Sequence, residues 1–187
     1  MCAVYANRQL FLSTVLYLII GVAFANIGTI FSALGQDPEV AMLATRFVLM
    51  SYPFYYFEVF WFVFVENFAV NQNVPEYQIH SQIAGTFSHL LFVYILCYHY
   101  EMGFDGVCLA TGLMQVVFGL TGLFLVKNSS KFRTFYDVSL FSKETITNLR
   151  PLLVQDLKSV GTQIWMFWNA DSSVLIASYL GQSYLAA

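Results

Sequence analysis

The chain has 187 residues, of which 58% are hydrophobic, 18% are aromatic and only 10% are charged, with a formal net charge of -3 at pH 7. Soluble domains carry about 25% charged residues, so this composition excludes an ordinary water-soluble domain and indicates a membrane protein. The small negative charge gives no reason to expect nucleic acid as a partner.

Long uncharged windows divide the chain into expected helices. Three windows contain no Asp, Glu, Lys or Arg: 9–36, 77–100 and 106–126. Each reaches the roughly 20 residues that a helix needs to cross a bilayer. Two further windows, 47–65 and about 159–180, are interrupted by Glu58 and Asp171 respectively. We therefore predict an all-α fold, a polytopic transmembrane helical bundle of about five helices.

The first connection, "SALGQDPEVA" (32–41), has the residues of a tight turn between two helices. Gly35 can take the left-handed conformation that ends one helix, Asp37 can cap the next, and Pro38 suits a first helical turn. The two helices should therefore be antiparallel neighbours. Within the second of them, Pro53 removes one backbone hydrogen bond and should bend the helix.

The turn "YEMGFDGVCLATG" (100–112) opens a helix with small residues spaced four apart, which pair as Gly106 with Ala110 and Cys108 with Gly112. Such spacing lets another backbone come close, so we expect this face to pack against protein and not against lipid. The three cysteines form no CxxC pair, and we expect them to be free thiols.

Basic residues predict the orientation. If the helices alternate in direction, the connections 1–8, 66–76 and 127–150 share one membrane face and hold nearly all the Lys and Arg, whereas the opposite face holds Arg46 alone. The positive-inside bias then places 127–150 in the cytoplasm. As the longest polar segment, 127–150 should link two helical parts, which are 1–126 with four transmembrane helices and 151–187 with one.

At its turns the sequence resembles the multidrug and toxic compound extrusion (MATE) transporters, a family within the polysaccharide-flippase superfamily. The resemblance depends on the order and spacing of several segments together with Pro53: "CAVYANRQ" (2–9), "LGQDPEVA" (34–41), "FAVNQNVP" (68–75), "GFDGVCLATG" (103–112) and "LIASYLGQSYLAA" (175–187). These segments are similar to the third to sixth helices of the first lobe, the interlobe linker and the first helix of the second lobe.

The resemblance implies a multi-pass protein of a plasma or organelle membrane, part of a twelve-helix, two-lobe transporter. The chain would then be a fragment that needs the missing helices of the same transporter as partners. The implied function is secondary active efflux of small organic cations or xenobiotics by alternating access, in antiport with H⁺ or Na⁺. No further cofactor is expected.

Asp171 is the candidate exchange site. If the last helix begins near Ser159, Asp171 lies about 18 Å along it, close to the bilayer midplane. A charge there costs roughly 2.5 to 3.5 kcal/mol, so the carboxyl group should face a water-filled cavity or be protonated. A proton on Asp171 would release a cation, and loss of the proton would attract the next one. The alternative is a structural carboxyl group bonded within the bundle.

Three other residues complete the predicted cation or substrate site. Trp168 lies on the same helical face as Asp171 and could add cation-π attraction, although lipid-facing packing explains it equally well. Gln163 could line the cavity or bond a neighbour. Glu58 could face the lobe cavity beyond the bend at Pro53, or play a structural part. The family often has a second carboxylate five residues before the position of Asp171, where this chain has Met166.

Other patterns have simpler interpretations. The histidines 80, 89 and 99 fall on different helical faces, so they cannot form one metal site. The aromatic run "YPFYYFEVFWFVF" (52–64) is explained mainly by lipid contact and bundle packing. The chain has no phosphate-binding loop with a lysine, no HExxH and no GxSxG, so we do not expect an enzyme.

The sequence leaves two alternative functions open. A lipid or polysaccharide flippase should line its cavity with Arg or Lys to hold phosphate groups, and the predicted helices before residue 127 contain none. A non-transporting membrane scaffold would need no binding cavity.

The fragment interpretation predicts that the isolated 187-residue chain will not transport, because half of the alternating-access machinery would be missing. The measurement is uptake of a fluorescent organic cation into proteoliposomes under a pH gradient. Robust antiport by this chain alone would contradict the interpretation.

Overall fold

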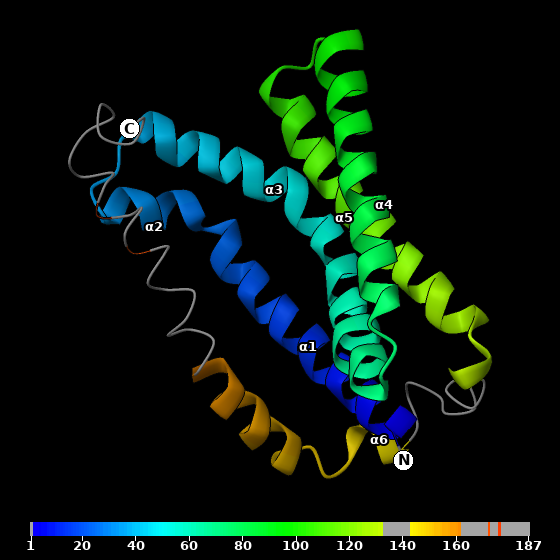
Figure 1. The fold of residues 1–187 in the computed structure, drawn as a ribbon. Coiled ribbons are helices and arrows are strands. Elements are labelled where there is room, and N and C mark those ends of the chain that lie inside the picture. Colours follow the sequence, from blue (N-terminus) through cyan, green and yellow to red (C-terminus); the bar gives the residue numbers. More distant parts are fainter. Residues whose placement is uncertain (1, 133–142, 162–171, 173–175, 177–187) are drawn as a thin grey trace. The chain divides into compact units, whose positions relative to one another are not determined.

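A computed structural model of the protein describes residues 2–132, 143–161, 172 and 176 (Figure 1). The chain divides into two compact units, Met1–Ile146 and Thr147–Ala187. The described residues form helices and no strand, which confirms the predicted all-α fold. In the second unit residues 150–161 are helical, and most of the predicted fifth helix, 159–180, falls outside the described residues.

The described residues of the first unit are mostly helical. Their bounds are α1 (Cys2–Ala25), α2 (Ile27–Ala33), α3 (Pro38–Trp61), the π-helix η1 (Phe62–Ala69), the 3-10 helix η2 (Val70–Gln72), α4 (Glu76–Val93), the π-helix η3 (Tyr94–His99), α5 (Phe104–Asn128) and α6 (Lys143–Ile146). Among the described residues, four stretches are long and apolar enough to cross a membrane, and these are Val4–Ala25, Pro38–Gln72, Glu76–His99 and Phe104–Asn128. They fit a membrane-embedded protein.

The turn between α2 and α3 has the predicted geometry. Gly35 has a φ of 76°, in the left-handed region that favours glycine. The side chain of Asp37 accepts a hydrogen bond of 2.8 Å from the backbone N–H of Glu39, and Pro38 is the first residue of α3. The helix therefore begins at Pro38, as the turn residues predict, which is nine residues before the window 47–65. Arg46, which limits that window, is accommodated inside the helix by an ion pair with Asp105.

The same helical stretch also extends beyond its predicted end at residue 65. It passes through η1 and η2 to Gln72, and it stops where Asn73 takes a left-handed φ of 59° shortly before Pro75. The helix therefore extends through most of the predicted connection 66–76. Glu66 and the polar residues after it do not interrupt a helix, whereas a left-handed residue followed by proline does. Glu66 consequently lies inside a span-length helix.

The small-residue face of α5 packs against protein, as predicted. Its buried residues are Gly106, Cys108, Ala110, Gly112, Gln115, Gly119, Gly122 and Val126. A Cβ atom added at Gly119 would lie 2.3 Å from the backbone carbonyl oxygen of Phe57 in α3, and one added at Gly112 would lie 2.5 Å from the ring of Phe54. The backbones of α3 and α5 are therefore close at these glycines. Cys97 and Cys108 are free thiols, as expected.

A compact core joins the start of α1 to the end of the long α3–η2 helix. It is a cluster of buried apolar residues: Ala6, Leu10, Trp61, Val63, Phe64, Val65, Ala69, Val74, Val126 and Phe132. Trp61 anchors it, because its indole N–H donates a 2.6 Å hydrogen bond to Ser81 of α4 and its ring stacks on Phe118 of α5 at 4.2 Å. Large apolar side chains on the other faces, such as Val22 and Phe87, are exposed and suit contact with lipid.

The close approach at Gly119 generates a stability prediction. Gly119→Ala should lower the free energy of unfolding by about 1 to 3 kcal/mol, because the added methyl group meets a backbone carbonyl that cannot rotate away. The measurement is the midpoint of reversible unfolding by SDS in mixed micelles. Gly85→Ala is the control, since its methyl group would meet only the Phe118 ring, at 3.2 Å. Equal midpoints for the two variants would contradict the prediction.

Candidate functional site

Of the four predicted site residues, Glu58 belongs to the described part of the chain. Asp171, Trp168 and Gln163 lie outside the described residues. The exchange scheme at Asp171 therefore stays a prediction, and Glu58 is the predicted site residue whose surroundings the structure describes.

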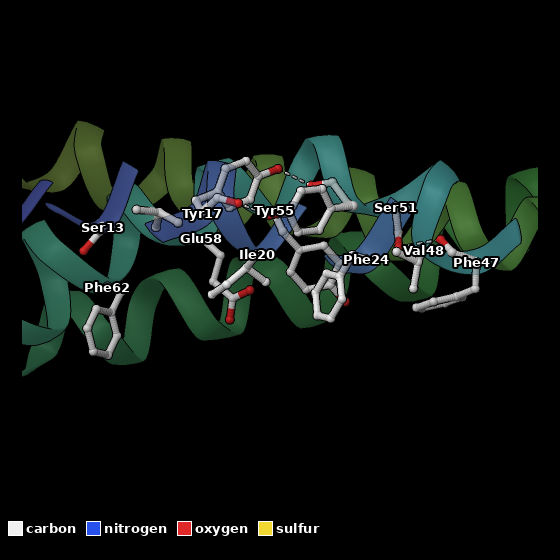
Figure 2. A pocket seen from close by; sticks show the side chains of 12 residues that line it. Ser13, Tyr17, Ile20, Phe24, Phe47, Val48, Ser51, Tyr55, Glu58 and Phe62 are labelled. Carbon is white, nitrogen blue, oxygen red and sulfur yellow. Dashed lines mark hydrogen bonds between the residues drawn. The ribbon is translucent and has the colours of Figure 1, made fainter. Parts of the chain in front are cut away.

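Glu58 lines a cavity between α1 and α3 (Figure 2). The cavity has a volume of about 570 Å³. Its wall consists of Ser13, Tyr17, Ile20 and Phe24 from α1 and of Phe47, Val48, Ser51, Tyr52, Tyr55, Glu58, Val59 and Phe62 from α3 and the first residue of η1. Half of these side chains are aromatic, one is an acid, and none is Lys or Arg.

The two helices that form the cavity run antiparallel along each other. Gly21 of α1 lies against the side chain of Tyr52, while Gly28, further along the chain, lies against the earlier residue Thr45. Residues 34–37 connect α2 to α3, and both α1 and α2 contact α3. The predicted antiparallel pairing of these helices is therefore confirmed.

A stacked pair of tyrosines joins α1 to α3 beside Glu58. The rings of Tyr17 and Tyr52 are parallel within 4°, with centroids 4.5 Å apart. The Tyr17 hydroxyl donates a 2.5 Å hydrogen bond to the backbone carbonyl of Tyr52, and the Tyr52 hydroxyl donates to the backbone carbonyl of Tyr17. One turn further on, the hydroxyl groups of Thr14 and Tyr56 are 2.9 Å apart and share a hydrogen bond. These hydrogen bonds pair polar groups in an apolar layer, where an unpaired hydroxyl group would be unfavourable.

Glu58 lies near the middle of the bundle. Its Oε2 accepts a 3.1 Å hydrogen bond from Nε2 of Gln115, which is the twelfth of the 25 residues of α5. Eleven helical steps correspond to about 17 Å, roughly half of a hydrocarbon core of about 30 Å. Glu58 is half-buried, with the cavity on one side and Gln115 behind it. An intramembrane acid in this position is a functional candidate with a specific partner.

The cavity wall contains one acid and no basic residue. In the described part of the chain, Arg46 pairs with Asp105 near the start of α5, and Arg8 donates a 2.9 Å hydrogen bond to the backbone carbonyl of Glu144. Neither lines the cavity. The described residues also contain no group of three or more His, Cys, Asp or Glu that could hold a metal ion. Glu58 therefore presents its carboxyl group to a cavity whose other walls are aromatic, apolar or hydroxyl groups.

Sequence reasoning missed several residues of this site. Tyr17 was not singled out, and the aromatic run 52–64 was assigned mainly to packing, yet Tyr52, Tyr55 and Phe62 from that run line the cavity. The signal for Gln115 was available, since it is the one amide side chain in the uncharged window 106–126. Aromatic residues at adjacent positions do not indicate which of them line a cavity, because neighbouring positions point to different sides of a helix.

Comparisons with known proteins supply no family for this chain. A scan against protein-family models found no match, and searches of the curated proteins and of the solved structures found none either.

The tyrosine pair generates a prediction about the α1–α3 contact. Tyr17→Phe and Tyr52→Phe should each lower the free energy of unfolding by about 0.6 kcal/mol, the average for an interhelical hydrogen bond in a membrane protein. Stacking is preserved in both variants, so the hydroxyl contribution is isolated. SDS unfolding midpoints test this, with the exposed Tyr98→Phe as control. The interpretation fails if neither variant differs from Tyr98→Phe.

Proposed function

We propose that this chain is part of a membrane transporter that binds small organic cations in the cavity between α1 and α3, with Glu58 as the anionic contact. The observation that carries the proposal is a carboxylate near mid-depth in an aromatic cavity whose described lining includes no basic residue. Burying an acid in a membrane is unfavourable, and a bound cation offsets part of that cost.

The size and wall of the cavity suit an organic cation better than a bare metal ion. Small-molecule pockets measure about 300 to 1,000 Å³, and the volume of about 570 Å³ falls inside that range. Tyrosine and phenylalanine faces attract a cation by roughly 0.5 to 2 kcal/mol each. Tyr55 and Phe62 line the same cavity as Glu58, so one ligand in it can contact aromatic side chains and the carboxyl group.

The resemblance to MATE transporters extends the proposal to transport. Under it the chain contributes helices of a two-lobe secondary active exporter, and binding of H⁺ or Na⁺ alternates with binding of the organic cation. Glu58 would then serve the first lobe while Asp171 serves the second. Both acids share the property that occupancy by a proton or a cation removes a charge from the membrane interior.

The alternatives are less well supported by the same cavity. A flippase for phosphorylated lipids or polysaccharides requires Arg or Lys around the headgroup, and the described lining offers a carboxylate instead. A membrane scaffold gives no reason for an acid to face a cavity. We accordingly retain cation export as the proposal.

Tetraphenylphosphonium is a suitable probe, because it combines one positive charge with aromatic surface. We expect Glu58→Gln to weaken its binding at least about tenfold, since the variant keeps the side-chain shape but removes the charge. Binding would be measured by equilibrium dialysis of the purified chain in lipid nanodiscs.

Two controls make this test specific. Glu76→Gln, an exposed acid in the first turn of α4, should bind the probe like the unmodified chain. An uncharged ligand of similar shape, triphenylphosphine oxide, should bind Glu58→Gln and the unmodified chain equally. Equal tetraphenylphosphonium affinity in the Glu58→Gln and Glu76→Gln variants would refute the proposed function.

A further inference from the structure

The geometry points to Gln115 as a positioning residue for Glu58. We propose that its amide group holds one carboxyl oxygen from behind and leaves the other for the ligand in the cavity, in both the charged and the neutral form of the acid. This inference depends on the proposed function for its ligand, but the contact between the two side chains can be tested without one.

Gln115 reaches Glu58 because two glycines of α5 beside it let α3 come close. Gly112 and Gly119 stand three residues before and four residues after Gln115, and α3 comes so close at both that a Cβ atom would overlap Phe54 or the carbonyl of Phe57. Residues three and four apart share a helical face. The amide of Gln115 is therefore pressed against α3, with only 6% of the residue exposed.

The hydrogen bond is not needed to join the two helices. The glycine contacts and the stacking of Trp61 on Phe118 already bring α3 and α5 together. A leucine or methionine could fill the space of Gln115 at lower cost in an apolar layer. The polar side chain is explained by its partners, which are the carboxyl group that faces the cavity and the side chain of Tyr55.

An amide has a property that suits a site with two occupancy states. Its nitrogen donates two hydrogen bonds and its oxygen accepts two. Nε2 of Gln115 donates to Oε2 of Glu58 at 3.1 Å, an arrangement that suits the ionised carboxylate. When Glu58 carries a proton, rotation of the amide presents Oε1 as an acceptor for that proton. A lysine or arginine would serve the ionised form alone and would compete with the cationic ligand.

The first measurement uses no ligand. Infrared difference spectra of the chain in nanodiscs identify the carbonyl stretch of protonated Glu58 as the band that Glu58→Gln removes. In Gln115→Met, which keeps the length of the side chain but has no amide, this band should move to higher wavenumber because its hydrogen bond is lost. Gln82→Met, an exposed glutamine on α4, should leave the band unchanged. An unmoved band in Gln115→Met would overturn the inference.

The second measurement is a double-mutant cycle with tetraphenylphosphonium. Gln115→Met should weaken binding about tenfold in the unmodified chain and have no effect in the Glu58→Gln background, because the residue acts through Glu58. Equal weakening in both backgrounds, or none in either, would overturn the positioning role. If the unmodified chain itself does not bind the probe, the proposed function fails, while the infrared band still decides whether Gln115 holds Glu58.

Discussion

The near-contact of the α3 and α5 backbones is the constraint on which the rest of the structure depends. At Gly119 the Phe57 carbonyl occupies the space that any side chain would need, so the two helices are closer there than larger residues allow. In a membrane, where lipid tails are as apolar as leucine, such small-residue contacts provide much of the association between helices. The same approach places Gln115 against Glu58 and thereby sets one wall of the candidate site.

On the opposite side of α3, the contact with α1 depends on polar groups, whereas the contact with α5 depends on small residues. Tyr17 and Tyr52 join α1 to α3 by a stacked pair with reciprocal hydrogen bonds to backbone carbonyls. Glycine contacts on one side of α3 and tyrosine hydrogen bonds on the other fix this helix between two neighbours. The acid is thus held near the centre of the bundle by a helix that is packed on both sides, which is the arrangement expected of a preorganised site.

Helix ends show where sequence patterns succeed and where they fail. The turn at Gly35, Asp37 and Pro38 was predictable, because left-handed glycine, a capping acid and a first-turn proline each act through local backbone geometry. The window 47–65 was a poor guide to the helix ends, because Arg46 and Glu66 limit the window but do not interrupt the helix. Arg46 remains inside α3 by pairing with Asp105, a partner 59 residues away that no local pattern reveals.

The sequence by itself determined that this protein is made of apolar helices of membrane length, that small residues on one face of the helix from residue 104 pack against protein, and that Glu58 is an unusual acid inside a span. These properties follow from composition and periodicity, which can be read from each segment of the sequence without knowledge of its distant neighbours. Only the tertiary structure decided which side of α3 Glu58 occupies, that Tyr17 comes from another helix to share its cavity, and that Gln115 is its partner. Such contacts depend on the rotation and separation of whole helices, and these are set by the sum of many small packing contacts between residues far apart in the chain.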